Sequence, residues 1–124
     1  MRNKAMIDII AFEEASKNQV KDLRAIGINP TIFWAYRVSR DVGNELIDFA
    51  EVIWDRDVED IVRVFRENDI TEFTISTGMS SIIETLALFE SYGCKIGGLT
   101  KVNARYDDIM TGKKKVIPAL RMCL

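Results

Sequence analysis

The strongest constraint on the fold is the stretch DRDVEDIVRVFREND, residues 55–69, which lies between two segments that alternate like β-strands. Its apolar side chains recur at the spacing that gathers them on one face of an α-helix, at Val58, Ile61, Val62 and Phe65. Carboxylates precede this stripe and arginines follow it, which suits the dipole of a helix. Because a helix between two strands connects them in parallel through a right-handed crossover, the stretch predicts an α/β fold.

The segments around this helix supply further elements. ELIDFAEVIW, residues 45–54, alternates its apolar side chains between two faces, and EFTIS, residues 72–76, is a shorter run of the same kind. Another helix is predicted over residues 80–92, where Gly93 supplies a stop. Its inward side chains are expected to be Ile82, Ile83, Leu86 and Phe89.

The C-terminal part is predicted to form an antiparallel hairpin. Its strands cover residues 95–106 and 114–124, and the turn DDIMTG joins them. Pro118 cannot donate a backbone hydrogen bond, so the returning strand is expected to lie at an edge of the sheet or to bulge there. Together with the two earlier strands, the hairpin completes a mixed sheet of about four strands on which the helices pack.

Two helices are predicted before the sheet. Residues 3–26 are expected to form one long helix that ends at Gly27, because their apolar side chains fall close to one face. The second helix lies in INPTIFWAYRVSRDVG, residues 28–43, where Asn29 can cap it and Pro30 suits its first position. Its bulky apolar side chains surround more than one face, which favours packing on two sides or a contact between subunits.

The chain has 124 residues, of which 48% are apolar, so one domain with its own core is expected over residues 1–124. This domain divides into a helical part, residues 1–43, and an α/β part, residues 44–124. The fold class is therefore α/β (α+β). No stretch approaches the roughly 18 apolar residues of a membrane span, and the N-terminus lacks the apolar run of a signal peptide. We expect a cytoplasmic protein that does not enter a membrane.

The composition excludes several kinds of catalytic and metal site. The chain contains no histidine, which removes imidazole acid–base catalysis, the Ser-His-Asp triad and zinc sites with histidine ligands. Cys94 and Cys123 are expected to be free thiols, and Cys94 to be buried. The acidic residues at 55–60 suit a helix dipole better than a metal site, and Asp55 is a candidate N-cap. We therefore expect no catalytic residues, no metal and no cofactor.

Charge is unevenly distributed along the chain. Residues 1–99 carry 11 Lys and Arg against 17 Asp and Glu, whereas residues 100–124 carry 6 against 2. A nucleic-acid surface would use the basic side chains of the second segment, namely Lys101, Arg105, Lys113, Lys114 and Lys115. Three lysines in a hairpin turn are more commonly just solvated, so nucleic-acid binding is the less favoured interpretation.

The clearest candidate for a binding loop is TISTGMSSIIETL, residues 74–86, where a short strand leads through a polar loop into a helix. Backbone N–H groups at such a helix start can hold an anion, and the residues that would take part are Ser76, Thr77, Gly78, Ser80 and Ser81. The loop contains neither a Walker motif nor a G-x-G-x-x-G motif. Ser81 and Glu84 also have the spacing of a capping box, and this structural interpretation is favoured over a ligand site.

The stretch ALFESYGCKIGGL, residues 87–99, resembles the A-x-x-L-Y-E-K-x-G-F-x-x-x-G pattern of GNAT-type N-acetyltransferases, and the basic-ended hairpin that closes on ALRMCL is similar to theirs. This resemblance, from about Ile70 to Leu124, implies a GNAT-like topology in the C-terminal half. In that family the acetyl-CoA loop lies at the start of the helix that corresponds to the one beginning at Asp55. This chain has carboxylates and no glycine at that place. The family's general-acid tyrosine corresponds to Phe89. The resemblance therefore implies the topology and argues against acetyl transfer. The segments NELIDFAEVIW and GLTKVNARYDD also look like small uncharacterised bacterial proteins.

These observations lead to three hypotheses about function. The first is a non-catalytic binding or regulatory domain that acts as a homodimer, because catalytic groups are absent and the second helix carries apolar bulk. The alternative is a binder of a small anionic ligand, or a degenerate acyltransferase-like protein, that uses the loop at residues 76–81. The third is weak nucleic-acid binding through the basic C-terminal part.

Overall fold

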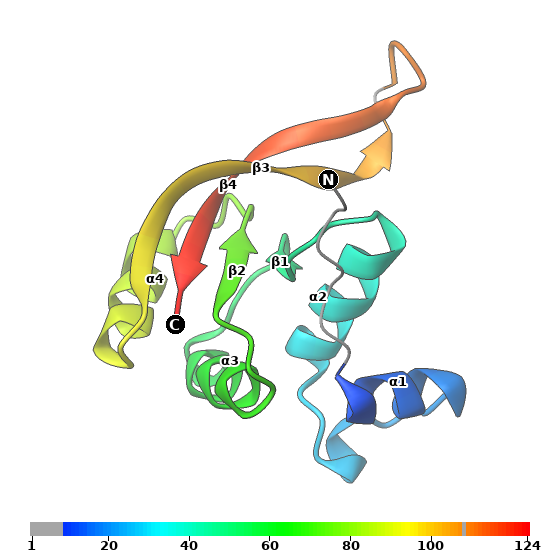
Figure 1. The fold of residues 1–124 in the computed structure, drawn as a ribbon, viewed down its shortest axis with the longest axis vertical. Helices are drawn as coiled ribbons and strands as arrows, with labels where there is room; N and C mark the ends of the chain where they lie inside the picture. Colours follow the sequence, from blue (N-terminus) through cyan, green and yellow to red (C-terminus); the bar gives the residue numbers. More distant parts are fainter. Residues whose placement is uncertain (1–8, 108) are drawn as a thin grey trace.

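The structure is a computed structural model that describes residues 9–107 and 109–124, and Figure 1 shows how its elements are arranged. Its helices are α1 (Ile10–Lys17), α2 (Pro30–Asp41), α3 (Asp55–Glu67) and α4 (Ile82–Ser91), with a 3-10 helix at Arg24–Ile26. Its strands are β1 (Asp48–Phe49), β2 (Glu72–Ile75), β3 (Lys95–Asp107) and β4 (Lys114–Cys123). None of the helices described is long and apolar enough to cross a lipid bilayer.

The strands form one mixed sheet in the order β1-β2-β4-β3. β1 and β2 are parallel, and β4 is antiparallel to both of its neighbours. The predicted α+β class with a mixed four-stranded sheet is therefore confirmed. β2 pairs only with residues 120–123 of β4, so β4 has a single neighbouring strand at Pro118, where it lacks a donor.

The core is one cluster that joins the sheet to all four helices, and its centre lies where α3 and α4 meet the sheet. Phe65 of α3, Phe73 of β2 and Phe89 of α4 are fully buried, and successive ring centroids in this row are 5.3 Å apart. The predicted apolar stripe of α3 is buried throughout, at Val58, Ile61, Val62 and Phe65. Cys94 is buried as predicted, and this burial raises the pKa of its thiol.

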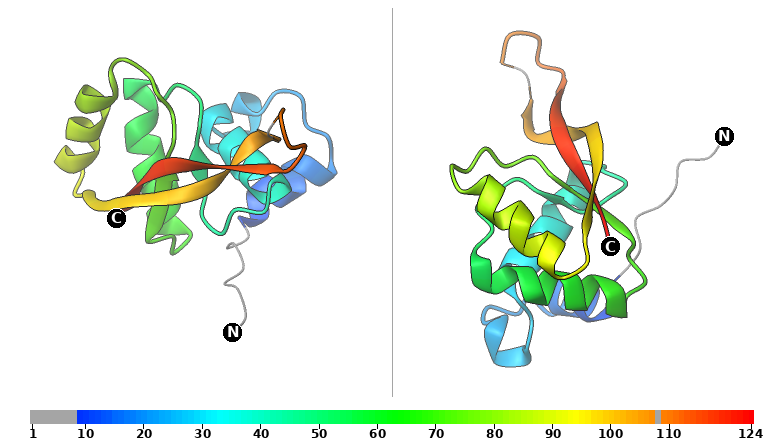
Figure 2. Two further views of the ribbon diagram at one scale, coloured as in Figure 1. Left: turned by 90° about the horizontal axis from the view of Figure 1, so that it is seen from above. Right: turned by 90° about the vertical axis from the view of Figure 1, so that its left-hand side faces the viewer.

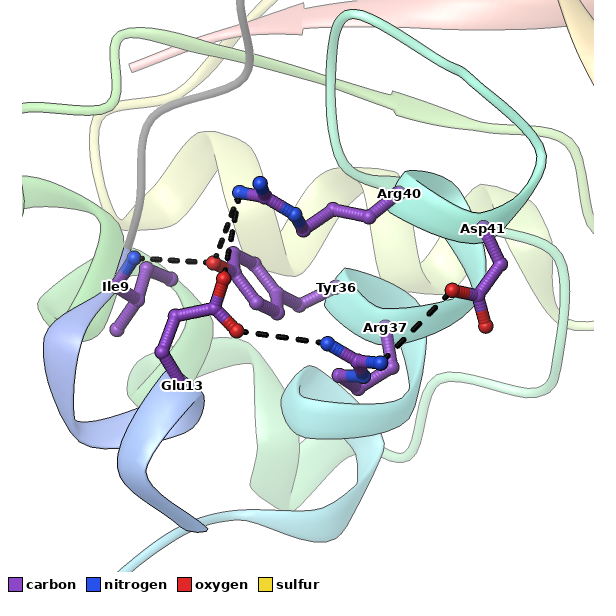
Figure 3. A network of polar contacts seen from close by, with 6 residues as sticks. All are labelled: Ile9, Glu13, Tyr36, Arg37, Arg40 and Asp41. Atoms are coloured by element: carbon purple, nitrogen blue, oxygen red, sulfur yellow. Dashed lines mark hydrogen bonds and ion pairs between the residues drawn. The ribbon is translucent and has the colours of Figure 1, made fainter. Parts of the chain in front are cut away.

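A polar network holds α1 against α2, as Figure 3 shows. The backbone N–H of Ile9 donates to the hydroxyl of Tyr36 over 3.3 Å, and the Arg40 guanidinium donates to the same hydroxyl over 3.2 Å. Glu13 of α1 pairs with Arg37 at 3.4 Å and with Arg40 at 3.7 Å. Tyr36 is fully buried, so its hydroxyl needs these partners, and they fix the position of α1.

The two predicted helix caps have different outcomes. The Asn29 side chain accepts from the N–H of Thr31 at 2.9 Å, which confirms the predicted cap of α2. The predicted Asp55 cap of α3 is wrong, because Trp54 takes the cap position and its N–H donates to Asp57 at 3.3 Å. Asp57 also accepts from Asn29 and Thr31, so this buried carboxylate ties the starts of α2 and α3 together.

The long helix predicted over residues 3–26 is wrong. Its first part lies outside the described residues, and α1 ends before Gln19, whose φ of 52° is incompatible with a right-handed helix. After this break, only Arg24–Ile26 is helical, and Gly27 ends that turn with a φ of 80°. The apolar spacing predicted helical structure correctly for α1 and for this turn, but the backbone changes direction between them.

The strand predicted over residues 45–54 is reduced to Asp48–Phe49. Residues 45–46 lie in a bend, and β2 ends at Ile75, the partner of Phe49, so residues 50–54 have no strand beside them. The backbone N–H groups of Ser76 and Thr77 both donate to the carbonyl of Phe49, at 3.0 and 3.2 Å. Within the described chain, β1 and β2 make no strand pair beyond this point. Residues 50–54 leave the sheet and lead into α3.

The end of the β3–β4 hairpin projects beyond the helices, and we call it the arm (residues 106–107 and 109–116). Figure 1 and the right-hand view of Figure 2 both show it standing out from the rest of the molecule. Asn103 anchors its base: the backbone N–H donates to the Asn44 side chain at 2.8 Å, and the side chain donates to the Val42 carbonyl at 2.9 Å. Asn44 returns a bond to the Asn103 carbonyl at 3.2 Å, so β3 is held beside the loop that follows α2.

Candidate ligand-binding site

A buried carboxylate lies where β1 and β2 separate. Asp48 is 5% exposed, and it accepts hydrogen bonds from the hydroxyls of Thr74, at 2.7 Å, and Ser76, at 2.6 Å. Thr74 is its partner in the parallel pair, and Ser76 follows the end of β2. The hydroxyl of Ser39 in α2 accepts from the Asp48 backbone N–H at 2.9 Å. Neighbouring elements therefore position both the backbone and the side chain of Asp48.

This carboxylate has no cationic partner among the residues that the structure describes. Burying a carboxylate is costly unless hydrogen bonds or an opposite charge replace the lost water. The hydroxyls of Thr74 and Ser76 supply two bonds, whereas an ionised carboxylate can accept about four. Asp48 therefore retains acceptor capacity that nothing in the described chain uses.

Asp48 lines a cavity of about 350 Å³. Asp48 and Ser76 border it from the ends of the parallel strands, and Asn103, Arg105 and Tyr106 border it from β3. A second hollow, of about 250 Å³, adjoins the cavity at Asn103. Polar groups that are distant in sequence therefore meet around one space at the carboxyl ends of β1 and β2, where open α/β sheets commonly bind ligands.

An ion pair separates this cavity from a more apolar space, which we call the tryptophan groove. Arg105 donates to Glu51 over 2.9 Å, and both residues border the cavity and the groove. The groove has a volume of about 340 Å³, and its lining includes Val52 and the chain's 2 tryptophans, Trp34 and Trp54. Trp34 is 58% exposed and Trp54 is 54% exposed, so the protein leaves large apolar surfaces uncovered at this place.

The predicted binding loop is divided between two places. Ser76 donates to the buried carboxylate in the cavity, whereas Ser81 borders a separate hollow of about 600 Å³ near the start of α3. Thr77 is partly buried, and Gly78 and Ser80 are exposed. Anion binding by all five residues together stays a prediction, but only Ser76 belongs to the cavity described above.

The start of α4 differs from the predicted capping box. Ser81 takes the N-cap position but its side chain makes no capping hydrogen bond, so the predicted pair with Glu84 is wrong. The reason is conformational: Ser81 has φ −95° and ψ 21°, not the extended backbone from which a cap side chain reaches the next turn. Ile83, predicted to face inward, is 71% exposed.

The predicted nucleic-acid residues are spread along β3 and β4 and are partly engaged within the protein. Arg105 is paired with a carboxylate at the groove, and Lys114 donates to a backbone carbonyl in the loop after α2 at 3.0 Å. Lys115 lies 5.2 Å from the centre of a tyrosine ring. Lys101 borders the hollow beside the cavity, and Lys113 is exposed near the end of the arm. Nucleic-acid binding through these residues stays a prediction.

The acidic residues at the start of α3 take part in hydrogen bonds within the protein. Asp60 accepts from the Asn29 side chain at 3.2 Å and from Arg63 at 3.1 Å. Within residues 9–107 and 109–124, no group of three or more His, Cys, Asp and Glu side chains is placed to hold a metal ion.

Sequence reasoning missed the centre of this site. Asp48 stands in the apolar run LIDFA, and a single carboxylate among the apolar positions of a strand was the available signal. No local pattern marks Asn103 or Tyr106, because they reach the cavity only where the hairpin passes the ends of other strands. The aromatic residues of α2 were expected to pack in the core or to form a contact between subunits. Phe33 and Tyr36 are buried in the core and Trp34 is exposed, and a subunit contact stays a prediction.

Residues 31–124 match the family described as a domain of unknown function (DUF7698), and the chain belongs to this family. The match extends over nearly all of α2 and over every strand, so it includes all the residues around the cavity. No curated protein and no solved structure matches the chain. The expectation of an uncharacterised family is thereby confirmed, whereas the likeness to GNAT-type enzymes rests on the sequence pattern alone.

Proposed function

We propose that this member of a family of unknown function is a non-catalytic binding domain, and that the cavity beside Asp48 holds a small ligand with an amino group. The observation that carries this proposal is the buried Asp48 carboxylate, which lines the cavity and has only hydroxyl partners in the described chain. An ammonium group of a ligand would supply both the missing charge and the missing hydrogen-bond donors.

The shape and chemistry of the cavity support a small molecule. Its volume of about 350 Å³ falls within the roughly 300–1,000 Å³ range of small-molecule sites. Asn103 and Tyr106 add amide and phenol groups that can bind hydroxyl or carbonyl groups of a ligand. Arg105 is held by Glu51 at the other wall, so Asp48 is the acidic group without a basic partner at this cavity among the described residues.

Binding is favoured over catalysis by the direction of the hydroxyl protons. Thr74 and Ser76 donate to a carboxylate, which is a much weaker base than the imidazole that activates a serine nucleophile, and the chain has no histidine. These hydroxyls therefore position the carboxylate of Asp48 and are not prepared to attack a substrate.

A thermal-shift screen tests the proposal. Primary amines, diamines, amino acids and amino sugars form one panel, and CoA esters, nucleotides and phosphate form the other. An amine at about 100 times its Kd is expected to stabilise the wild-type fold by about 2.7 kcal/mol. Asp48→Asn keeps the shape of the side chain and removes its charge, so the stabilisation should disappear in this variant. Asp69→Asn is the matched control, because Asp69 is exposed at the end of α3.

Two outcomes would overturn the proposal. Retention of amine binding in folded Asp48→Asn protein, verified by circular dichroism, would place the amine elsewhere. Stabilisation by CoA esters or nucleotides alone would support the competing hypothesis of an anion site or degenerate acyltransferase at residues 76–81.

The cellular compartment is a separate part of the proposal. We propose that the protein acts in the cytoplasm, where thiols stay reduced. The support is that Cys94 and Cys123 are both free cysteines. Fractionation of cells that express the protein measures this, and recovery in an extracytoplasmic fraction would contradict it.

A further inference from the structure

The oxygen atoms around the Asp48 carboxylate accept further hydrogen bonds but donate none. The hydroxyls of Thr74 and Ser76 both donate their protons to Asp48, over 2.7 and 2.6 Å. A hydroxyl has one proton and two lone pairs, so each of these oxygens meets any further group only as an acceptor. Asp48 itself, when ionised, is an acceptor only. This end of the cavity therefore needs a ligand group that donates.

Asn103 adds another acceptor at the same cavity. Its side-chain nitrogen donates to the Val42 carbonyl over 2.9 Å, and this bond fixes which end of the amide is the oxygen. That oxygen accepts no hydrogen bond from the part of the chain that the structure describes. Asn103 borders the cavity together with Asp48 and Ser76. A primary ammonium group has three donors and no acceptor, which matches this set, whereas a quaternary ammonium group has no donor.

The charges around the cavity match a ligand with one net positive charge. Among the described residues, Asp48 and Glu51 border the cavity against one cation, Arg105. The adjoining hollow adds one charge of each sign, from Glu45 and Lys101. The described lining of the two spaces therefore carries one more carboxylate than cation. A monoamine neutralises this excess, whereas an amino acid brings its own carboxylate and leaves the excess in place.

The cation at the wall of the cavity already holds a carboxylate. Arg105 donates to Glu51 over 2.9 Å, and it makes no other hydrogen bond or ion pair within the described chain. An unpaired guanidinium binds the carboxylate of an amino acid through two parallel hydrogen bonds. With Glu51 in place, an incoming carboxylate instead meets a like charge. The remaining N–H groups of Arg105 still donate to a neutral hydroxyl or carbonyl group.

We propose that the cavity selects primary amines whose other polar groups are neutral, with amino alcohols as the simplest class, and that Glu51 excludes amino acids by occupying Arg105. The ammonium group binds at Asp48, and the neutral polar group binds at Arg105. Ala104 and Ile117 also border the cavity, and they contact the aliphatic part of the ligand. This selection rests on the proposed function, because it requires an amine to bind beside Asp48.

Two matched sets of ligands test the selection by isothermal titration calorimetry of the wild-type chain. Ethanolamine, glycine and choline share a two-carbon skeleton, and leucinol, leucine and N,N,N-trimethylleucinol share a larger one. The amino alcohol should bind roughly tenfold or more tightly than the amino acid or the quaternary amine of its set, since a hydrogen bond to a charged group contributes about that factor. Equal affinities of leucinol and leucine, or of leucinol and its trimethyl derivative, would overturn the selection.

Glu51→Gln tests the role of Glu51 directly. The variant gives Arg105 a neutral partner and removes the excess negative charge of the lining, so the affinity for leucine should rise about tenfold while that for leucinol does not rise. The Glu51 side chain is 76% exposed, so the variant should fold like the wild type, which circular dichroism checks. Glu67→Gln is the matched control, because Glu67 pairs with Arg63 on α3 and does not border the cavity. Wild-type affinity for leucine in folded Glu51→Gln protein would contradict the role of Glu51.

Amine binding and selection among amines are separable in these measurements. If leucinol and leucine bind equally and both lose affinity in Asp48→Asn, the amine site stands and the selection by Glu51 is wrong. The same conclusion follows if ethanolamine and leucinol both fail to bind while an amino acid or a diamine binds. If no amine of any kind binds, the proposed function is wrong and the selection falls with it.

Discussion

Two groups of aromatic side chains in this protein have opposite surroundings. Phe65, Phe73 and Phe89 have no exposed surface and form a row of rings in the core, whereas Trp34 and Trp54 are more than half exposed at the groove. A buried aromatic side chain contributes strongly to folding, and an exposed one forgoes most of that contribution. The difference indicates that burial of the phenylalanines stabilises the fold, whereas the tryptophans contribute less to it.

The backbone shows the same contrast. Residues 120–123 of β4 pair with strands on both sides, whereas the strand pairs described for the arm join β3 only to β4. Peptide groups of a strand with two neighbours are satisfied on both sides, whereas a strand with one neighbour pairs on one side. The centre of the sheet and the arm therefore differ in the number of strands that satisfy their backbone.

The largest expected effect separates the two aromatic groups. Phe65→Ala should lower the free energy of unfolding by about 3–5 kcal/mol, because it leaves a cavity in a packed core. Trp54→Ala, an aromatic truncation at the surface, should lower it by roughly 1 kcal/mol or less in dilute, monomeric protein. Urea unfolding followed by circular dichroism measures both values. Equal losses of unfolding free energy in the two variants would show that the tryptophans stabilise the fold as much as the core phenylalanines do.

A smaller effect is expected at the contact between α1 and α2. Tyr36→Phe removes the hydroxyl that accepts from the Ile9 N–H and from Arg40, and it should cost about 1–2 kcal/mol. Burial raises the pKa of Tyr36, so the folded protein holds this proton more tightly than the unfolded chain does. The resulting stability is complete below about pH 10, the ordinary tyrosine pKa, and is lost as pH rises through the folded value.

Unfolding as a function of pH measures this contribution of Tyr36. Wild-type protein should lose stability more steeply above about pH 10 than Tyr36→Phe does. Tyr92→Phe is the control, because Tyr92 is 37% exposed. Parallel alkaline profiles for wild type and Tyr36→Phe would show that this hydroxyl is not held as the structure indicates.

The smallest effect is expected for the ion pair between the cavity and the groove. The Glu51 side chain is 76% exposed, and water and salt screen such pairs, so a Glu51/Arg105 double-mutant cycle should give a coupling below about 1 kcal/mol. The pair Arg63–Glu67 on α3 is a comparable surface control. A coupling well above this limit would mean that the Glu51–Arg105 pair stabilises the fold in addition to bordering the cavity.

Local sequence patterns predicted the elements that depend on local interactions. The apolar stripe of α3, the short β2, the hairpin and the Asn29 cap all follow from side-chain periodicity or from a side chain that bonds to its own turn. The errors occur where a distant segment decides the outcome. Residues 50–54 are not a strand because β2 ends beside Phe49, and an apolar alternation does not contain that information.

The sequence by itself determined the α+β class, the order of the elements after Asp48, and the absence of histidine chemistry. Only the tertiary structure decided that Asp48 is a buried carboxylate beside a cavity and that Ser76 belongs with it while Ser81 does not. It also decided which aromatic side chains stay exposed. The physical reason is that periodicity reports which face of an element is apolar, whereas a site is made where the ends of different elements meet, and their meeting depends on the packing of the whole chain.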